Sequence, residues 1–292
     1  MTSNVAITSL EVRCISGKLD ELEACNLQLK SLDLHNCYLN KLLCSGNQLT
    51  SLDLSKNTAL TSLNCINNQL TSLDVSGCTA LTSLTCFNNQ LTSLDVSSCT
   101  ALRGLYCKNN QLTSLDLSKN TALTSLECGN NQLTALDVSS CTALTDLDCY
   151  NNQLTALDVS NCPALTRLSC NNNQLTALDM SGFTALTELS CYNNQLTSLN
   201  ASGCSALTNL FLTKPYSHDK DGNNSITIID VSGCSSLDWL DLETLDSITI
   251  LDVSGCTALP RLDCSDNQLT ALDVSGCTAL TWLDCYNNQL TA

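Results

Sequence analysis

Residues 81–101 decide the fold, and they read Leu-Thr-Ser-Leu-Thr-Cys-Phe-Asn-Asn-Gln-Leu-Thr-Ser-Leu-Asp-Val-Ser-Ser-Cys-Thr-Ala. The same 21-residue pattern recurs along most of the chain, and such a fixed period is the signature of a repeat architecture. One apolar position marks each unit, and it is occupied in turn by Ala24, Cys44, Cys65, Cys86, Cys107, Cys128, Cys149, Cys170, Cys191, Leu212, Leu242, Cys264 and Cys285. The 292 residues therefore contain thirteen units.

Alternation of apolar and polar residues predicts two short extended segments in each unit. In the quoted unit Leu84 and Cys86 face one way, and Leu94 and Val96 repeat the alternation. Two such segments and their turns use up 21 residues, so little helix is expected. We predict an irregular lead-in over residues 1–20, and one solenoid over residues 21–292 with an insertion at 213–225.

These motifs resemble a leucine-rich repeat, L-x-x-L-x-L-x-x-N-x-L, with cysteine in the third apolar place. The added half, L-x-x-L-D-V, is similar to the short bacterial class called IRREKO, whose 21-residue unit reads L-x-x-L-x-C-x-x-N-x-L-x-x-L-D-V. The resemblance implies a right-handed leucine-rich-repeat solenoid, formally an α/β superhelix but mostly β. It also implies that parallel strands stack on the concave face.

A column of asparagines follows the marked position by three residues and predicts a structural ladder. An amide both donates and accepts hydrogen bonds, so stacked asparagines can satisfy backbone groups of buried turns. The ladder residues are Asn47, Asn68, Asn89, Asn110, Asn131, Asn152, Asn173, Asn194, Asn267 and Asn288.

A column of aspartates accounts for much of the acidity, because eleven of the 28 acidic residues occupy it. Nine of them lie in the sequence Leu-Asp-x-Ser, which predicts a hydrogen bond from the backbone two residues on. A column that binds cations is the alternative. The residues are Asp33, Asp53, Asp74, Asp95, Asp116, Asp137, Asp158, Asp179, Asp230, Asp252 and Asp273.

Most of the 21 cysteines fall in two columns, one on the strand and one in the opposite turn. Leucine, asparagine and phenylalanine replace them there, so no bonding partner is required, and no C-x-x-C pair suggests zinc. We therefore expect reduced thiols that pack as small apolar side chains. Cys14, Cys25 and Cys37 are judged out of phase, and they are the expected exceptions.

Composition excludes several classes of function. A formal charge of −16 and a pI of about 4.1 disfavour nucleic acid as a partner, and no apolar run is long enough for membrane insertion. The two histidines lie in no motif that would activate a nucleophile, so the chain is predicted not to be an enzyme and to need no cofactor.

The one string that resembles a metal site lies in the insertion, and no metal is favoured there. Asp219, Asp221 and Asn223 are spaced like the first ligands of a calcium loop. The glycine is misplaced, however, and flanking helices are not expected. An ordinary polar turn is the preferred interpretation.

Variable residues concentrate at the outward positions of the strand segment, which the resemblance places on the concave face. Eight of the eleven aromatic residues lie there, and exposed aromatics and arginines are typical of binding surfaces. Random drift of duplicated repeats is the alternative. The predicted ligand-binding residues are Phe87, Tyr106, Lys108, Tyr150, Arg167, Tyr192, Phe211, Trp239, Arg261, Trp282 and Tyr286.

The sequence thus predicts a module that binds a protein or glycan ligand, with the resemblance implying a bacterial surface adhesin or receptor. A structural spacer without a ligand is one alternative. An ice- or crystal-binding array on the opposite, threonine-rich face is another. The resemblance implies a secreted or surface location, with the export signal absent from this sequence. A cytoplasmic location is the alternative. The last repeat ends without a polar cap, so end-to-end association through the C-terminus is a further expectation.

Overall fold

The computed structural model describes residues 8–14, 19–34, 37–213, 225–243 and 245–291. It confirms a parallel-strand solenoid of about 12 turns, close to the thirteen units counted in the sequence. The described residues form strands and turns without a helix, so no helix there is long and apolar enough to cross a membrane. The chain divides into two compact units, Met1–Leu144 and Thr145–Ala292.

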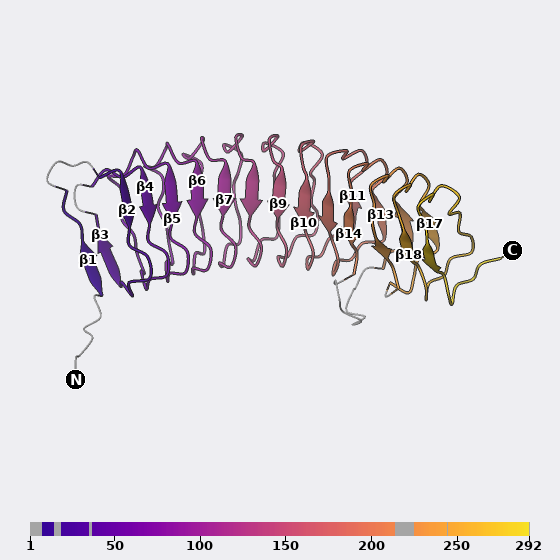
Figure 1. Cartoon of the computed structure of the whole chain (residues 1–292). Coiled ribbons are helices and arrows are strands. Elements are labelled where there is room, and N and C mark those ends of the chain that lie inside the picture. Colours follow the sequence, from indigo (N-terminus) through magenta and orange to yellow (C-terminus); the bar gives the residue numbers. More distant parts are fainter. Residues whose placement is uncertain (1–7, 15–18, 35–36, 214–224, 244, 292) are drawn as a thin grey trace. The chain divides into compact units, whose positions relative to one another are not determined.

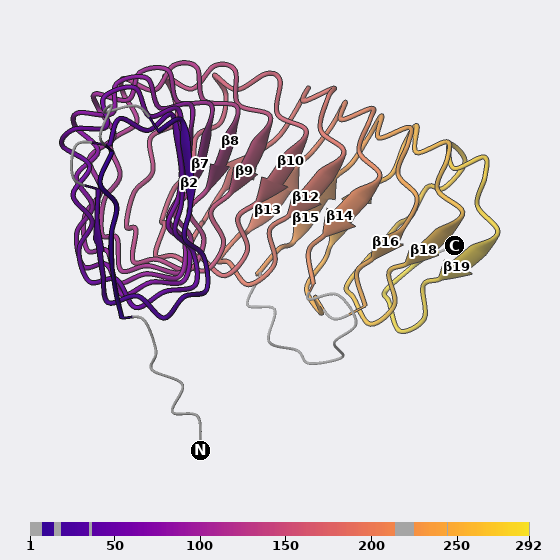
Figure 2. The same ribbon diagram turned by 60° about the vertical axis from the view of Figure 1, so that its left-hand side comes forward.

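The first unit stacks its strands in parallel at a shift of one repeat (Figure 1). Leu42 pairs with Leu63, and Leu63 pairs with Leu84. Successive turns of this unit trace over one another in Figure 2. The strands of this first column are β2 (Glu21–Glu23), β4 (Lys41–Leu43), β5 (Ser62–Asn64), β6 (Ser83–Thr85), β7 (Gly104–Tyr106) and β8 (Ser125–Glu127).

Strand β1 (Ser9–Glu11) belongs to the coil, although the sequence placed it in an irregular lead-in. It pairs in parallel with β3 (Ser31–Asp33), and Leu10 lies opposite Leu32. Residues 9–11 therefore add a rung to the second, Leu-x-x-Leu-Asp segment of the repeat. The lead-in was missed as a repeat because Glu11 replaces the usual aspartate.

The second unit repeats the stack and adds a second strand column. Its first column contains β9 (Asp146–Asp148), β10 (Arg167–Ser169), β12 (Glu188–Ser190), β14 (Asn209–Phe211), β16 (Leu240–Asp241), β18 (Arg261–Asp263) and β19 (Trp282–Asp284). A single bridge between Asn209 and Trp239 links β14 to the next rung. The second column contains β11 (Leu178–Asp179), β13 (Ser198–Asn200), β15 (Ile228–Asp230) and β17 (Ile250–Asp252).

Left-handed glycines accompany the second strand column. Gly182, Gly203, Gly233 and Gly255 have φ of 73–75°, a conformation that glycine adopts without steric cost. The turn then continues the pairing, since the Gly182 amide donates to the Ser202 carbonyl at 2.8 Å. Where serine, lysine or asparagine fills this turn, as at Ser97 and Ser98, the Leu-Asp segment is extended without forming a strand.

The predicted interior is confirmed. Leu84, Cys86, Leu91 and Val96 of the quoted unit are all fully buried. Each unit therefore contributes apolar side chains from both extended segments to one continuous core. Burial of this kind is the main favourable term in folding.

The asparagine ladder is confirmed as well. The Oδ1 atom of Asn89 accepts the Leu70 amide at 3.0 Å, and its Nδ2 atom donates to the carbonyls of Cys65 and Cys86, both at 3.0 Å. One side chain thus joins two successive turns. The ladder fixes the spacing at which the strands, and the outward side chains on them, follow one another.

A second ladder was not foreseen. The residue before each ladder residue adopts the left-handed conformation, with φ of 56° at Asn88 and 54° at Asn109, and it is asparagine except at Gly46 and Asp266. Asparagine tolerates this region better than other side chains do. The Nδ2 atom of Asn109 donates to Oδ1 of Asn88 at 2.7 Å, so these amides also stack.

The aspartate column makes the predicted local bond. Oδ1 of Asp95 accepts the Ser97 amide at 2.9 Å, and the same contact recurs along the column. Bonds from the Ser97 hydroxyl and amide lower the pKa of Asp95, although Asp116 nearby opposes the shift. The aspartates therefore serve as local caps of the turns.

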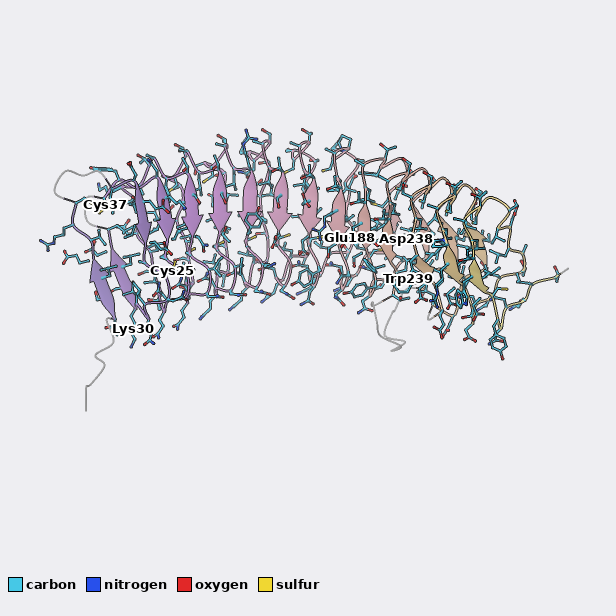
Figure 3. All side chains as sticks on the ribbon, viewed as in Figure 1. Cys25, Lys30, Cys37, Glu188, Asp238 and Trp239 are labelled. Atoms are coloured by element: carbon cyan, nitrogen blue, oxygen red, sulfur yellow. A yellow bond between two sulfur atoms is a disulfide. The ribbon has the colours of Figure 1, made fainter. Side chains whose placement is uncertain are left out.

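The thiols are reduced and packed as expected, with one disulfide at the N-terminal end. Nineteen described cysteines are free, and all but Cys25 and Cys285 are buried. Cys14 and Cys37 form a disulfide. Cys37 (labelled in Figure 3) was wrongly judged out of phase: its amide donates to the Leu34 carbonyl at 2.9 Å, the bond that Cys78 makes to Val75. Unequal spacing of the first repeats concealed this register.

Candidate binding surface on the strand face

The outward side chains of the first strand column form the candidate site, and we call this surface the strand face. On each rung it comprises the two outward strand residues and the residue after the marked apolar position. In β6 these are Ser83, Thr85 and Phe87, with Leu84 buried between them. Phe87, Tyr106 and Lys108 lie on the strand face of the first unit, and the other eight predicted residues lie on that of the second.

In the first unit the charged side chains of the strand face bind one another. Nζ of Lys108 lies 2.7 Å from a carboxylate oxygen of Glu127 and 5.4 Å from the centre of the Phe87 ring. Lys41 pairs with Glu21 on the preceding rung at 2.6 Å. The lysines of this face are therefore already engaged.

Tyr106 folds over a glycine. A Cβ atom added to Gly104 would lie 2.8 Å from Cε2 of Tyr106, so the ring occupies the space that a side chain would fill. Gly104 replaces the serine that precedes the buried leucine on neighbouring rungs, Ser83 and Ser125. This glycine holds the tyrosine ring close to the sheet.

In the second unit the face begins with a charged rung. Arg167 of β10 lies in register with Asp146 on one side and Glu188 on the other. Its Nε atom approaches Glu188 at 3.6 Å. Burial, with Tyr150 nearby, raises the pKa of the half-buried Tyr192.

Large aromatic side chains are exposed on the later rungs. Trp239 and Trp282 each expose 38% of their surface, and Tyr286 exposes 74%. The guanidinium carbon of Arg261 lies 4.0 Å from the centre of the Trp282 ring, a close cation–π contact. Figure 3 labels Trp239 among the side chains of the second unit.

Three carboxylates gather between these aromatic residues. One oxygen atom each of Asp241, Glu243 and Asp263 lies within 4.8 Å of the others. Asp263 is also in register with Asp284 on the next rung. An acidic stripe therefore runs along the middle of the strand face, beside Trp239 and Trp282.

Each aspartate of this stripe accepts a hydrogen bond from the backbone amide two residues further along the chain. Oδ1 of Asp241 accepts the Glu243 amide at 3.2 Å, and Oδ1 of Asp284 accepts the Tyr286 amide at 3.0 Å. Asp263 accepts both the amide and the hydroxyl of Ser265. The carboxylates are therefore fixed in position. The sequence already places aspartate at the same outward position in three successive repeats.

The aromatic residues of this face do not share one column. Tyr192, Phe211 and Trp239 do follow one another on successive rungs, but each occupies a different one of the three outward columns. Arg261 stacks on Trp282, and Arg167 faces Glu188. The aromatic and charged residues are therefore distributed along the face, and the acidic stripe is its densest feature.

The calcium candidate of the insertion lies outside the described residues. Asp219, Asp221 and Asn223 belong to the stretch 214–224, so the prediction for them stays untested.

Comparison with known proteins identifies the repeats. The family model for leucine-rich repeats in two copies matches five overlapping segments, residues 58–99, 79–120, 100–141, 121–161 and 142–184. A model for the LVIVD repeat matches residues 220–239. No curated protein matches the chain.

Solved structures agree with this fold. The functional domain of InlJ from Listeria monocytogenes, which includes a cysteine ladder, shares 34% identity at a TM-score of 0.67. The alignment covers 94% of this chain and 64% of that one. The leucine-rich effector protein YopM from Yersinia pestis shares 26% identity at a TM-score of 0.60, with coverage of 92% and 66%.

A third structure, the internalin InlF from Listeria monocytogenes, is similar in fold at 21% identity, with a TM-score of 0.57 and coverage of 92% and 87%. The chain therefore carries leucine-rich repeats and has bacterial leucine-rich-repeat proteins among its structural neighbours. It spans about two thirds of the length of the InlJ domain and of YopM.

Proposed function

We propose that the chain is a non-enzymatic binding module whose strand face recognises a protein ligand. One observation supports this most strongly. Eight of the eleven aromatic residues, and all the basic residues described in the second unit, lie on this face. The remaining columns of the repeat are occupied by side chains that the coil itself needs.

The opposite face offers less to a ligand. Its exposed positions repeat threonine and serine, and its aspartates cap their own turns. Drift would have diversified these exposed residues as well. Aromatic and charged variation concentrated on the strand face is therefore better explained by recognition than by drift alone.

A surface role on a bacterial cell, as an adhesin or receptor, belongs to the same proposal, as does membership of the 21-residue IRREKO-like class. The similarity to the InlJ functional domain and the 21-residue register of the strands support it. A glycan ligand is the second possibility, because flat exposed rings such as Trp239 suit sugar rings.

A binding screen with matched variants tests the proposal. The purified chain is applied to protein and glycan arrays, and dissociation constants are then measured for each hit. Trp239→Ala or Tyr192→Ala should weaken binding by about 2 kcal/mol or more, the loss typical of a central aromatic contact. Circular dichroism should show an unchanged fold.

Two controls keep the experiment specific. Tyr38→Ala removes an aromatic residue that is 51% exposed but lies off the strand face. Thr71→Lys and Thr176→Lys add charge to the opposite face. Each should change binding less than twofold. Loss of the ligand in the controls, with binding retained in Trp239→Ala and Tyr192→Ala, would show that the strand face is the wrong one.

A further inference from the structure

The strand face of the second unit combines charge and aromatic surface in a way that selects a ligand. The strand residues and the residues that follow them carry seven carboxylates and two guanidiniums on this surface. The carboxylates are Asp146, Asp148, Glu188, Asp241, Glu243, Asp263 and Asp284, and the guanidiniums are Arg167 and Arg261. The described part of the second unit holds no other basic side chain.

The first unit provides the contrast that makes this excess informative. There Lys108 and Lys41 form short ion pairs with Glu127 and Glu21. In the second unit Arg167 approaches Glu188, and Arg261 lies against Trp282. The carboxylates of Asp241, Glu243 and Asp263 face one another, and no described basic side chain forms an ion pair with them.

Arg261 shows how this surface binds a cation. Its guanidinium carbon lies 4.0 Å from the centre of the Trp282 ring, on the rung where the acidic stripe continues to Asp284. Trp239 stands beside Asp241 with a comparable exposed area. A ring next to a carboxylate suits a guanidinium, which can stack on the one and form paired hydrogen bonds with the other.

From this arrangement we infer that the strand face from β14 to β19 is the docking surface for an arginine-bearing segment of a protein partner in the polyproline II conformation. The inference rests on the proposed function and deepens it by naming the chemistry of the ligand. Neighbouring rungs lie about 4.8 Å apart, so Asp241 and Asp284 are separated by about 10 Å. Three residues of a peptide in the polyproline II conformation span about 9.3 Å and bring the side chain back to the same side, which places arginines at every third position.

A short peptide tests this directly. The probe is a fluorescein-labelled nonapeptide, Gly-Arg-Gly-Gly-Arg-Gly-Gly-Arg-Gly, whose affinity is measured by fluorescence polarisation at about 50 mM salt. Peptides with lysine or with glutamate in place of arginine are the comparison. We expect the arginine peptide to bind most tightly and the glutamate peptide not to bind.

The double variant D241N/D263N removes two charges without breaking the turns. Asparagine already makes the same local bond at Asn64, whose Oδ1 accepts the Ile66 amide at 3.2 Å. The matched control is D252N/D273N, which makes the same charge change on the second column of the same unit, where both aspartates accept a serine amide. We expect at least a tenfold loss of affinity in D241N/D263N and less than a twofold change in the control.

Three outcomes would overturn the inference. Equal losses in the two double variants would show attraction to overall negative charge, and absence of arginine-peptide binding would remove the ligand class. In a calorimetric titration with calcium alone, a binding heat that D241N/D263N abolishes would assign the carboxylates to a metal site. If an array ligand still depends on Trp239 while the peptide fails to bind, the proposed function stands and only this inference fails.

Discussion

Each coil has two interior turns that satisfy buried backbone groups by different means. In the turn after the first strand, Asn110 accepts the Leu91 amide at 3.0 Å and donates to the carbonyls of Cys86 and Cys107 at 3.1 and 3.0 Å. In the opposite turn of the preceding unit, Sγ of Cys99 lies 3.6 Å from the carbonyls of Val75 and Cys78. The amide makes three good bonds where the thiol makes two weak ones.

Replacements occur in both columns but at different places: in the asparagine column they are Leu27 on the first rung and Pro215 and Leu245 around the insertion. Asn57, Asn120 and Phe183 occupy the thiol turn without interrupting the coil. Asn120 donates to the Val96 and Cys99 carbonyls, yet its buried Oδ1 atom has no partner. The thiol turn therefore accepts side chains of different size and polarity within the regular stack, whereas the regular repeats keep the donor and the acceptor of asparagine in the other turn. We expect mutations in the two turns to differ accordingly.

The largest effect is expected from Asn110→Ala. The variant leaves a buried amide and two carbonyls without their partner, and each such group costs about 1–3 kcal/mol. The free energy of unfolding should fall by about 3 kcal/mol or more, measured by urea denaturation. Cys99→Ala in the opposite turn is the control and should cost about 1–2 kcal/mol. Equal losses at the two positions would contradict the comparison.

A smaller loss is expected from Cys149→Ser, on the strand column. Cys149 is fully buried, and desolvation raises the pKa of its thiol well above the ordinary value. A hydroxyl in the same place is desolvated without an assured partner, so we expect a cost of about 1–3 kcal/mol in urea denaturation. A stability equal to that of the wild type would mean that this column is more polar than its packing indicates.

Asn120→Cys returns the commoner residue to the thiol turn. The substitution removes an unpartnered buried oxygen but also loses two hydrogen bonds from Nδ2. These effects oppose one another, so we expect the free energy of unfolding to change by less than about 1 kcal/mol. Thermal and urea denaturation measure it. A loss as large as that of Asn110→Ala would show that amides are as necessary here as in the ladder.

The same distinction explains what could be predicted from the sequence. The ladder, the aspartate caps and the buried thiols follow from one residue type at one place in every unit, such as Asn89 or Asp95. Features that depend on a single rung were missed. Pairing Cys14 with Cys37 requires knowledge of the register of the first, unequal repeats. The left-handed glycines occur in the turns of only some repeats.

The candidate surface was predicted by position but not by interaction. The strand alternation correctly placed Trp239 and Arg261 on the outward side. It could not tell that Arg261 would stack on Trp282, or that Lys108 would be paired, because these contacts depend on which rotamers meet across rungs. The carboxylates of Asp241, Glu243 and Asp263 likewise became a cluster only when two rungs were placed side by side.

The smallest effect concerns the aspartates that open the thiol turn. Asp74, Asp95 and Asp116 have lowered pKa values, caused by bonds from the serine two residues on. A group with a lowered folded pKa contributes stability above its unfolded pKa of about 3.9 and loses it as the pH falls through the folded value. Urea denaturation of the wild type should therefore show stability decreasing below about pH 4.

The triple variant D74N/D95N/D116N isolates this contribution. Asparagine keeps the acceptor, as Asn200 does in the same column with the Ser202 amide at 3.1 Å, but it does not titrate. The variant should lose less stability than the wild type between about pH 4 and pH 2.5, because three of the titrating caps are gone. Identical pH profiles would show that these bonds are equally strong in the unfolded chain. A steeper profile in the variant would show that repulsion between the aspartates along the column outweighs the stabilisation by their hydrogen bonds, so that they do not act as caps of the thiol turn.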